Sequence, residues 1–146
     1  MGVAYARVKL ANPRLPELAP VEVDALADTR SVHLCIPEHI AIQLNLEEID
    51  RREVTLADGS RQTVPYMGPI SLFVANRRGF AGAMVLGNQV LLGAIPMEDM
   101  DLVVNPRTQQ VIANPVNPNI AGSIAMGLLA CPSPNVTSTN TQTTEN

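Results

Sequence analysis

Apolar and polar side chains alternate along much of this chain, which is the pattern of β-strands with one buried face. Over residues 3–10, alanine, valine and leucine occupy one set of alternate positions. Residues 21–27 repeat the pattern with Glu22 and Asp24 on the polar face, and residues 32–36 form a shorter apolar run. We predict a strand in each segment. Residues 13–20 hold three prolines, which exclude a helix and predict an extended loop.

A helix is predicted over residues 37–44. Pro37 suits its first turn, where the missing N–H costs nothing, and Ile40, Ile42 and Leu44 supply an apolar side. One further helical turn is predicted over residues 96–101, with Pro96 at its start.

Hairpins are predicted where turn-forming residues separate apolar runs. The Asp58-Gly59 pair favours a tight turn, because glycine accepts a positive φ. Turns are expected at residues 58–59, 76–79 and 105–108, between strands at residues 52–57 and 61–66, 70–75 and 80–86, and 102–104 and 110–113. Two more apolar strands, residues 84–86 and 90–92, flank Gly87-Asn88.

The composition suits one domain with an aliphatic core. The chain has 146 residues, 46% of them apolar, with 3% aromatic residues and no tryptophan. A net charge of −4 with scattered Lys and Arg offers no basic field for nucleic acid. We see no secretory signal at Met1 and no apolar run long enough to cross a bilayer, so we expect a soluble, cytoplasmic protein that does not bind membranes.

The composition shifts near residue 115. We place the domain at residues 1–115, followed by a C-terminal extension, residues 116–146, rich in Asn, Pro, Ser and Thr. We expect this extension to be disordered from about residue 132, because it has no apolar periodicity there.

Candidate metal ligands are sparse. Cys35 and Cys131 do not define a disulfide framework, and Cys35 lies in an apolar run that predicts a buried free thiol. His33 and His39 have no cysteine or carboxylate at zinc spacing, so neither a metal site nor a cofactor is expected. Acidic residues near the second helical turn are expected to be solvated; these are Glu98, Asp99 and Asp101.

The strongest candidate for chemistry lies within residues 21–37. An apolar strand ends at Asp28, continues through Thr29, Arg30 and Ser31, and leads into a second apolar segment. This placement would hold the Asp28 carboxylate at a strand end against a packed scaffold.

The run Leu26-Ala27-Asp28-Thr29-Arg30-Ser31 resembles the catalytic motif of retroviral-type, or retropepsin-like, aspartic proteases, which read Asp-Thr/Ser-Gly-Ala after a short apolar strand. Arg30 replaces the motif's glycine. Residues 53–66 are similar to the flap hairpin of bacterial members, and residues 83–93 to the apolar strands and apolar-apolar-Gly signature near the end of that fold. Order and spacing agree over roughly residues 4–115, so the chain resembles a bacterial-type member of clan AA.

The resemblance implies a mainly β fold, a single-lobe acid-protease barrel with one short helix after the catalytic loop and a flap hairpin. Asp28 would be catalytic, supported by Thr29, Arg30 and Ser31. The implied flap and substrate-binding residues are Ala57, Asp58, Gly59 and Tyr66. Those implied to pack near the catalytic loop are Leu91, Leu92 and Gly93.

Hydrolysis of this kind needs two carboxylates that share one proton, as in the aspartic protease dyad. A chain with one motif therefore predicts a homodimer that presents Asp28 twice across a two-fold axis to a peptide or protein substrate. The resemblance gives Thr29 a buried role, its hydroxyl bonding across that axis. A guanidinium at Arg30 would lower the pKa of Asp28 and discourage the shared proton, and its side chain would hinder close approach of the two loops.

Two functions stay open. The first is a dimeric aspartic endopeptidase, a hydrolase. The second is a catalytically impaired relative that uses the groove and flap to bind peptides or to assemble with a partner. A metal hydrolase built on the acidic residues is a third, weaker alternative.

Overall fold

The computed structural model describes residues 4–123, which are mainly β, with 50% strand and 10% helix. The strands are β1 (Ala4–Ala11), β2 (Val21–Ala27), β3 (Leu34–Ile36), β4 (Glu47–Thr55), β5 (Arg61–Val74), β6 (Arg77–Val85), β7 (Leu91–Leu92), β8 (Leu102–Asn105) and β9 (Gln110–Ala113). The helices are α1 (Glu38–Gln43) and α2 (Ala94–Asp99).

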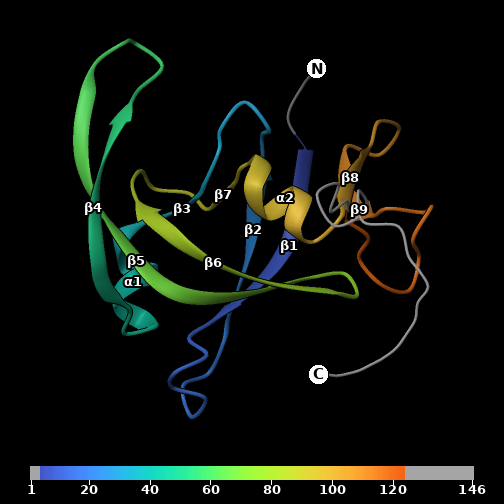
Figure 1. The fold of residues 1–146 in the computed structure, drawn as a ribbon, viewed down its shortest axis with the longest axis horizontal. Coiled ribbons are helices and arrows are strands. Elements are labelled where there is room, and N and C mark those ends of the chain that lie inside the picture. Colours follow the sequence, from blue (N-terminus) through green and yellow to red (C-terminus); the bar gives the residue numbers. More distant parts are fainter. Residues whose placement is uncertain (1–3, 124–146) are drawn as a thin grey trace, which may run out of the picture.

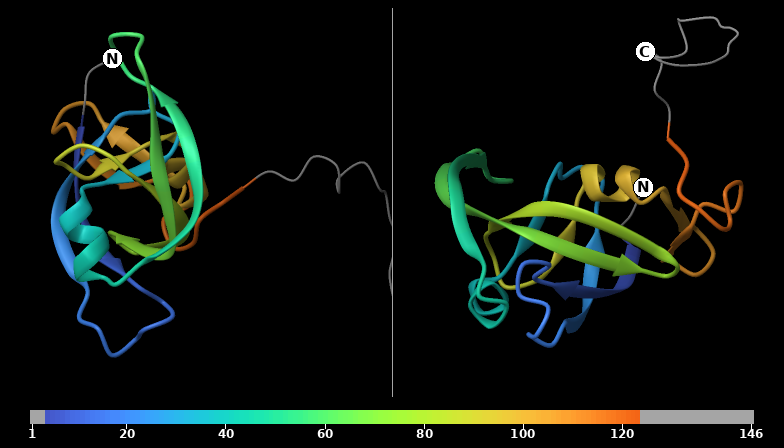
Figure 2. Two further views of the ribbon diagram at one scale, coloured as in Figure 1. Left: turned by 90° about the vertical axis from the view of Figure 1, so that its left-hand side faces the viewer. Right: turned by 60° about the horizontal axis from the view of Figure 1, so that its bottom comes forward.

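Six strands close into a barrel. The sheet order is β4-β5-β6-β3-β7-β2-β1-β9-β8, and an additional pairing of β5 with β1 closes the ring. Strand β4 remains outside as the free arm of a long hairpin, and β8 and β9 form a second hairpin beside β1 (Figures 1 and 2). The predicted mainly β, single-lobe barrel, with a short helix soon after residues 28–31, is confirmed.

The barrel interior is aliphatic. In β1 the alternation predicted from the sequence holds, because Ala4, Ala6, Val8 and Leu10 are buried while the residues between them are exposed. The buried apolar residues of the described chain are all alanine, valine, leucine, isoleucine or methionine, as the low aromatic content predicted. Packing against this interior fixes the positions of β2 and β7, and the loop of residues 28–31 directly follows β2.

Some local predictions were wrong. The turn predicted at residues 76–79 is formed instead by Ala75 and Asn76, since Val74 pairs with Arg77 and Ala75 adopts a φ of 53°. Arg77 is thereby the first residue of β6, and it is 3% exposed. The strands predicted separately before this turn are one strand, β5, with an irregularity between Met67 and Ile70.

Other elements also differ from prediction. The proline-rich loop is not extended, because the amides of Leu15 and Leu18 close two successive turns onto Asn12 and Leu15. The hairpin around Asp58 has a five-residue loop, since Thr55 pairs with Arg61. Helix α2 begins at Ala94, before Pro96, and makes a second short helix in the fold. None of the helices in the described part of the chain is long and apolar enough to cross a membrane.

The chain continues against the barrel past the predicted domain end at residue 115. The Asp101 carboxylate accepts hydrogen bonds from the side-chain amides of Asn114 (3.1 Å) and Asn117 (2.8 Å) and from the Gly122 backbone (2.8 Å). Buried Arg77 donates to the Asn117 carbonyl and also lies 3.8 Å from the Asp101 carboxylate. Residues 114–122 are therefore tied to β6 and the end of α2. Cys131 and the segment predicted to be disordered lie outside the described residues.

Candidate active site

Asp28 directly follows β2, at the point where that strand leaves its partner β7. Leu26 pairs with Leu91 and Ala27 with Leu92 in parallel register, and the Asp28 amide donates to the Leu92 carbonyl at 3.0 Å. The Asp28 carbonyl accepts the Ser31 amide at 3.0 Å, which closes a turn. The side chain of Asp28 is 16% exposed. Its carboxylate is thus positioned by backbone contacts on both sides.

Arg30 forms a two-point clamp on this carboxylate. Its Nε donates to Oδ1 at 2.9 Å and its Nη2 donates to Oδ2 at 2.7 Å, while its backbone amide adds a bond to Oδ1 at 3.0 Å. These bonds, led by the side-chain contact, lower the pKa of Asp28 from 3.8 to about 2, against the opposing effect of burial. The predicted direction is confirmed. Since the Arg30 side chain is 81% exposed, water screens its attraction to the Asp28 carboxylate.

Leu91, Leu92 and Gly93 lie directly beside this loop. The Ala94 amide donates to the Ser31 carbonyl at 2.8 Å, and the Ile95 amide donates to the Val32 carbonyl at 2.9 Å. A Cβ placed on Gly93 would lie 2.5 Å from the His33 carbonyl oxygen and 2.6 Å from the Val32 carbonyl carbon. The close approach of the two backbones therefore requires glycine at position 93.

The β4–β5 hairpin extends beyond the barrel (Figure 1). Its tip carries Ala57, Asp58 and Gly59, all exposed. Asp58 accepts hydrogen bonds from the amide and hydroxyl of Ser60, at 2.9 and 2.6 Å, and Gly59 adopts a φ of 87°. The tip is therefore a locally stabilised loop.

A groove lies between the hairpin and the loop that follows Asp28. It has a volume of about 410 Å³. The side chains lining it from the loop and β3 include Arg30, Val32, His33 and Cys35, and those from the hairpin include Arg52, Val54 and Leu56. A neighbouring hollow of about 310 Å³ shares several of these residues and continues to Ala57 and Asn88. The structure thus places the hairpin's inner side opposite the candidate motif.

Tyr66 lies at the base of the hairpin, away from its tip. Its ring packs on Gly82, where a Cβ would overlap the ring. The Arg52 guanidinium lies 4.2 Å from the ring centroid, and the His33 ring meets Tyr66 edge-on with centroids 6.3 Å apart. The sequence reasoning did not single out Arg52, although the alternation of β4 could have placed it on the same side as Val54 and Leu56.

Thr29 is on a different face from this groove. It is exposed in the single chain and lines a hollow of about 440 Å³ with residues of α2 and β8, among them Met97 and Leu102. Exposed Ile95 lies on α2, and Val32 follows the loop, with exposed fractions of 48% and 54%. The apolar residues that border Thr29 are those of α2 and β8, whereas Val32 lines the groove beside the hairpin.

Other predicted polar residues are not brought to the site. His39 and the acidic residues Glu98 and Asp99 are exposed, whereas Asp101 holds residues 114–122. Within residues 4–123, no three His, Cys, Asp or Glu side chains are grouped so as to hold a metal ion. Cys35 is a free, half-buried thiol whose pKa is raised by burial.

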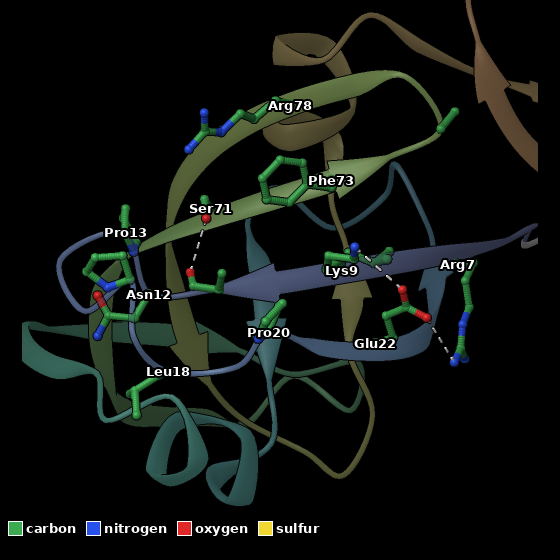
Figure 3. A pocket seen from close by; sticks show the side chains of 14 residues that line it. Arg7, Lys9, Asn12, Pro13, Leu18, Pro20, Glu22, Ser71, Phe73 and Arg78 are labelled. Atoms are coloured by element: carbon green, nitrogen blue, oxygen red, sulfur yellow. Dashed lines mark hydrogen bonds and ion pairs between the residues drawn. The ribbon is translucent and has the colours of Figure 1, made fainter.

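Another hollow, of about 690 Å³, contains none of the predicted site residues. Figure 3 shows it between Phe73 and Arg78 on one side and β1 with the proline-rich loop on the other. Both Arg7 and Lys9 on β1 are paired with Glu22. This hollow contains neither Asp28 nor the loop that follows it, so the hairpin groove is the candidate site.

The described structure defines a single-lobe β-barrel with one acidic loop beside a hairpin-bordered groove. No protein-family model matches this chain, and no curated protein matches it. Among solved structures, it is similar to a Legionella pneumophila protein of unknown function, with 16% sequence identity and a TM-score of 0.37. That match covers 66% of this chain and 87% of the other.

Proposed function

We propose that this protein is an aspartic endopeptidase of the retropepsin-like type that works as a homodimer. The observation that carries the proposal is the position of Asp28, whose carboxylate is held at a strand end in the same loop as Arg30 and Ser31, which line a groove bordered by a long hairpin. Peptide hydrolysis of this kind requires two carboxyl groups next to an extended substrate, one as base and one as acid, and each chain would supply one of them.

The second carboxylate would come from the partner subunit. With one Asp28 ionised and the other protonated, the first takes a proton from water and the water oxygen attacks the peptide carbonyl carbon. The second carboxyl group donates its proton to the carbonyl oxygen, which gives a tetrahedral intermediate with two hydroxyl groups. The first carboxyl group then gives its proton to the nitrogen, the second takes a proton from one of the hydroxyl groups, and the C–N bond breaks. Thr29 lies beside a hollow lined by apolar residues of α2 and β8, among them Met97 and Leu102, and these support a two-fold interface on that face.

The hairpin provides a means of holding an extended peptide. In the described sheet, β4 pairs with β5 and lies at the end of the strand order, so its outer edge has backbone groups free for pairing. A peptide strand added there would lie along the groove with alternate side chains directed into it. Cys35, a free thiol, suits the reducing cytoplasm in which we place this activity.

A second function is favoured by one specific contact. The Arg30 clamp keeps Asp28 ionised at ordinary pH, and two ionised carboxylates cannot supply a proton to the substrate. If the clamp persists in the dimer, the protein would bind peptides without cutting them.

Cleavage of denatured casein between pH 3 and 7 tests the peptidase proposal, with oligomeric state measured in parallel by sedimentation. We expect a dimer whose activity disappears in Asp28→Asn. The matched control is Asp24→Asn, because Asp24 is an exposed residue of β2, the strand that leads to Asp28, and pairs with Arg7. Cleavage that survives in Asp28→Asn, or a strictly monomeric active protein, would refute the proposal. Binding of casein peptides without any cleavage would select the second function.

A further inference from the structure

On the side of β4 that faces the groove, charged Arg52 is followed by apolar Val54. Arg52 and Val54 are half-buried, whereas Arg51 and Glu53 on alternate positions are exposed. Leu56 continues the inner side just beyond the strand, and all three inner residues line the groove. A charged side chain in this row requires a compensating partner, so Arg52 is the informative position.

Arg52 is held in place from two directions. Its Nε donates to Asp50 Oδ2 at 3.0 Å, and its guanidinium stacks 4.2 Å from the centroid of Tyr66, which is itself packed on Gly82. The pKa of Asp50 is lowered, first by the Arg51 backbone amide and then by the Arg52 side chain, so this partner stays ionised. The guanidinium is therefore oriented before any ligand arrives.

The remaining donors of Arg52 are uncommitted. Within residues 4–123, neither of its Nη atoms donates a hydrogen bond to another residue, and the side chain is 40% exposed. The other charged groups that line the groove are engaged, Arg30 with Asp28 and Glu53 with Arg61 at 3.6 Å. The groove consequently offers one oriented cationic group with free N–H donors, next to apolar Val54 and Leu56.

We infer that Arg52 sets the specificity of this groove by binding an acidic side chain of an extended peptide, with an apolar side chain two residues away against Val54 and Leu56. This inference rests on the proposed function, because it assumes that the groove holds a peptide. A carboxylate matches the guanidinium geometry and gains charge-assisted hydrogen bonds. The two-residue spacing follows from strand geometry, in which alternate side chains on one face are about 7 Å apart.

Binding of two labelled peptides to the full chain at neutral pH tests this inference. Both are short Val- and Leu-rich peptides that differ only at the central residue, which is Glu in the first and Gln in the second. Binding is measured by fluorescence anisotropy on the parent protein, in which Arg30 stays paired with Asp28. We expect the Glu peptide to bind about tenfold more tightly, as hydrogen bonds to a charged group allow. The preference should shrink as salt is raised.

The Arg52→Gln variant should lose this preference. Arg51→Gln is the matched control, because Arg51 is the exposed neighbour and pairs with Glu48 at 3.0 Å. Arg52→Lys keeps a charge without the planar fork and should retain only part of the preference, which provides a second test if Arg52→Gln loses the Tyr66 packing and unfolds.

Equal binding of the two peptides to the parent protein would overturn the inference while leaving peptide binding intact. Persistence of the preference in Arg52→Gln would do the same. Failure of both peptides to bind would instead reject the proposed function, and this inference with it.

Discussion

Replacing Arg30 by glycine should raise the activity of the proposed peptidase at mildly acidic pH. The guanidinium of Arg30 is the largest cause of the low pKa of Asp28, through its Nε and Nη2 bonds to the carboxylate. Glycine removes these bonds but keeps the backbone amide that donates to Oδ1. The pKa of Asp28 should therefore rise from about 2 toward its ordinary value of 3.8.

The size of the effect follows from the protonated fraction of Asp28. At pH 5, a pKa of about 2 leaves about 0.1% of the carboxyl groups protonated, whereas a pKa of 3.8 leaves about 6%. The upper limit of the gain is thus about 60-fold, from a shift of about 1.8 units. The retained amide bond makes the expected gain smaller than this limit.

The measurement is the rate of casein cleavage as a function of pH for the parent protein, Arg30→Gly and Arg30→Ala. Because a raised pKa extends the protonated form to higher pH, both variants should remain active at higher pH than the parent. Alanine removes the guanidinium but keeps a Cβ. Any additional gain in cleavage rate with glycine therefore reports how closely the Asp28 loops of the two subunits must approach. Arg14→Ala, which breaks an exposed ion pair with Glu47, is the control. Unchanged pH profiles in both Arg30 variants would refute the reasoning.

Three further outcomes are expected. The lowered pKa of Asp28 contributes stability that is fully present above about pH 4 and is lost as the pH falls through about 2. The free energy of unfolding in urea should therefore fall less steeply between pH 4 and pH 2 in Asp28→Asn than in the parent protein. Gly93→Ala should lower the free energy of unfolding by about 2 kcal/mol or more, since its Cβ would meet backbone atoms of residues 32 and 33. Gly87→Ala, at an open position with a φ of 79°, should cost only about 1 kcal/mol in the same assay, and an equal cost for both would contradict the packing argument. Asp101→Asn should speed hydrogen exchange of the Gly122 amide, which donates to that carboxylate, while an unchanged rate would show that residues 114–122 are held by other contacts.

Local patterns predicted the elements that depend on neighbouring residues. The alternation in β1 and the helix that begins after Pro37 followed from side-chain periodicity and the geometry of proline. The buried position of Arg77 did not follow from them. The polar run that contains it resembles a turn in the sequence, but Arg77 belongs to a strand, and its buried guanidinium donates to the carbonyl of Asn117, which is distant in the sequence. Such a contact is set by tertiary packing, which local propensity does not contain.

The candidate site shows the same division. The effect of Arg30 on Asp28 was predictable because the two residues are close in sequence and share one turn. The position of Arg52 against Tyr66 depends on the pairing of β4 with β5, and its exposure to the groove depends on the loop after β2. Barrel closure between β1 and β5 brings these segments together, and no single segment signals it.

The outer edge of β4 has a consequence for how this protein behaves when concentrated. An open row of amide and carbonyl groups is a template on which further copies can stack into fibrils. Here most of the side chains along β4 are acidic or basic, and a bulge between Glu48 and Asp50 interrupts the regular spacing of its backbone groups. These features discourage aggregation of the protein with itself through this edge.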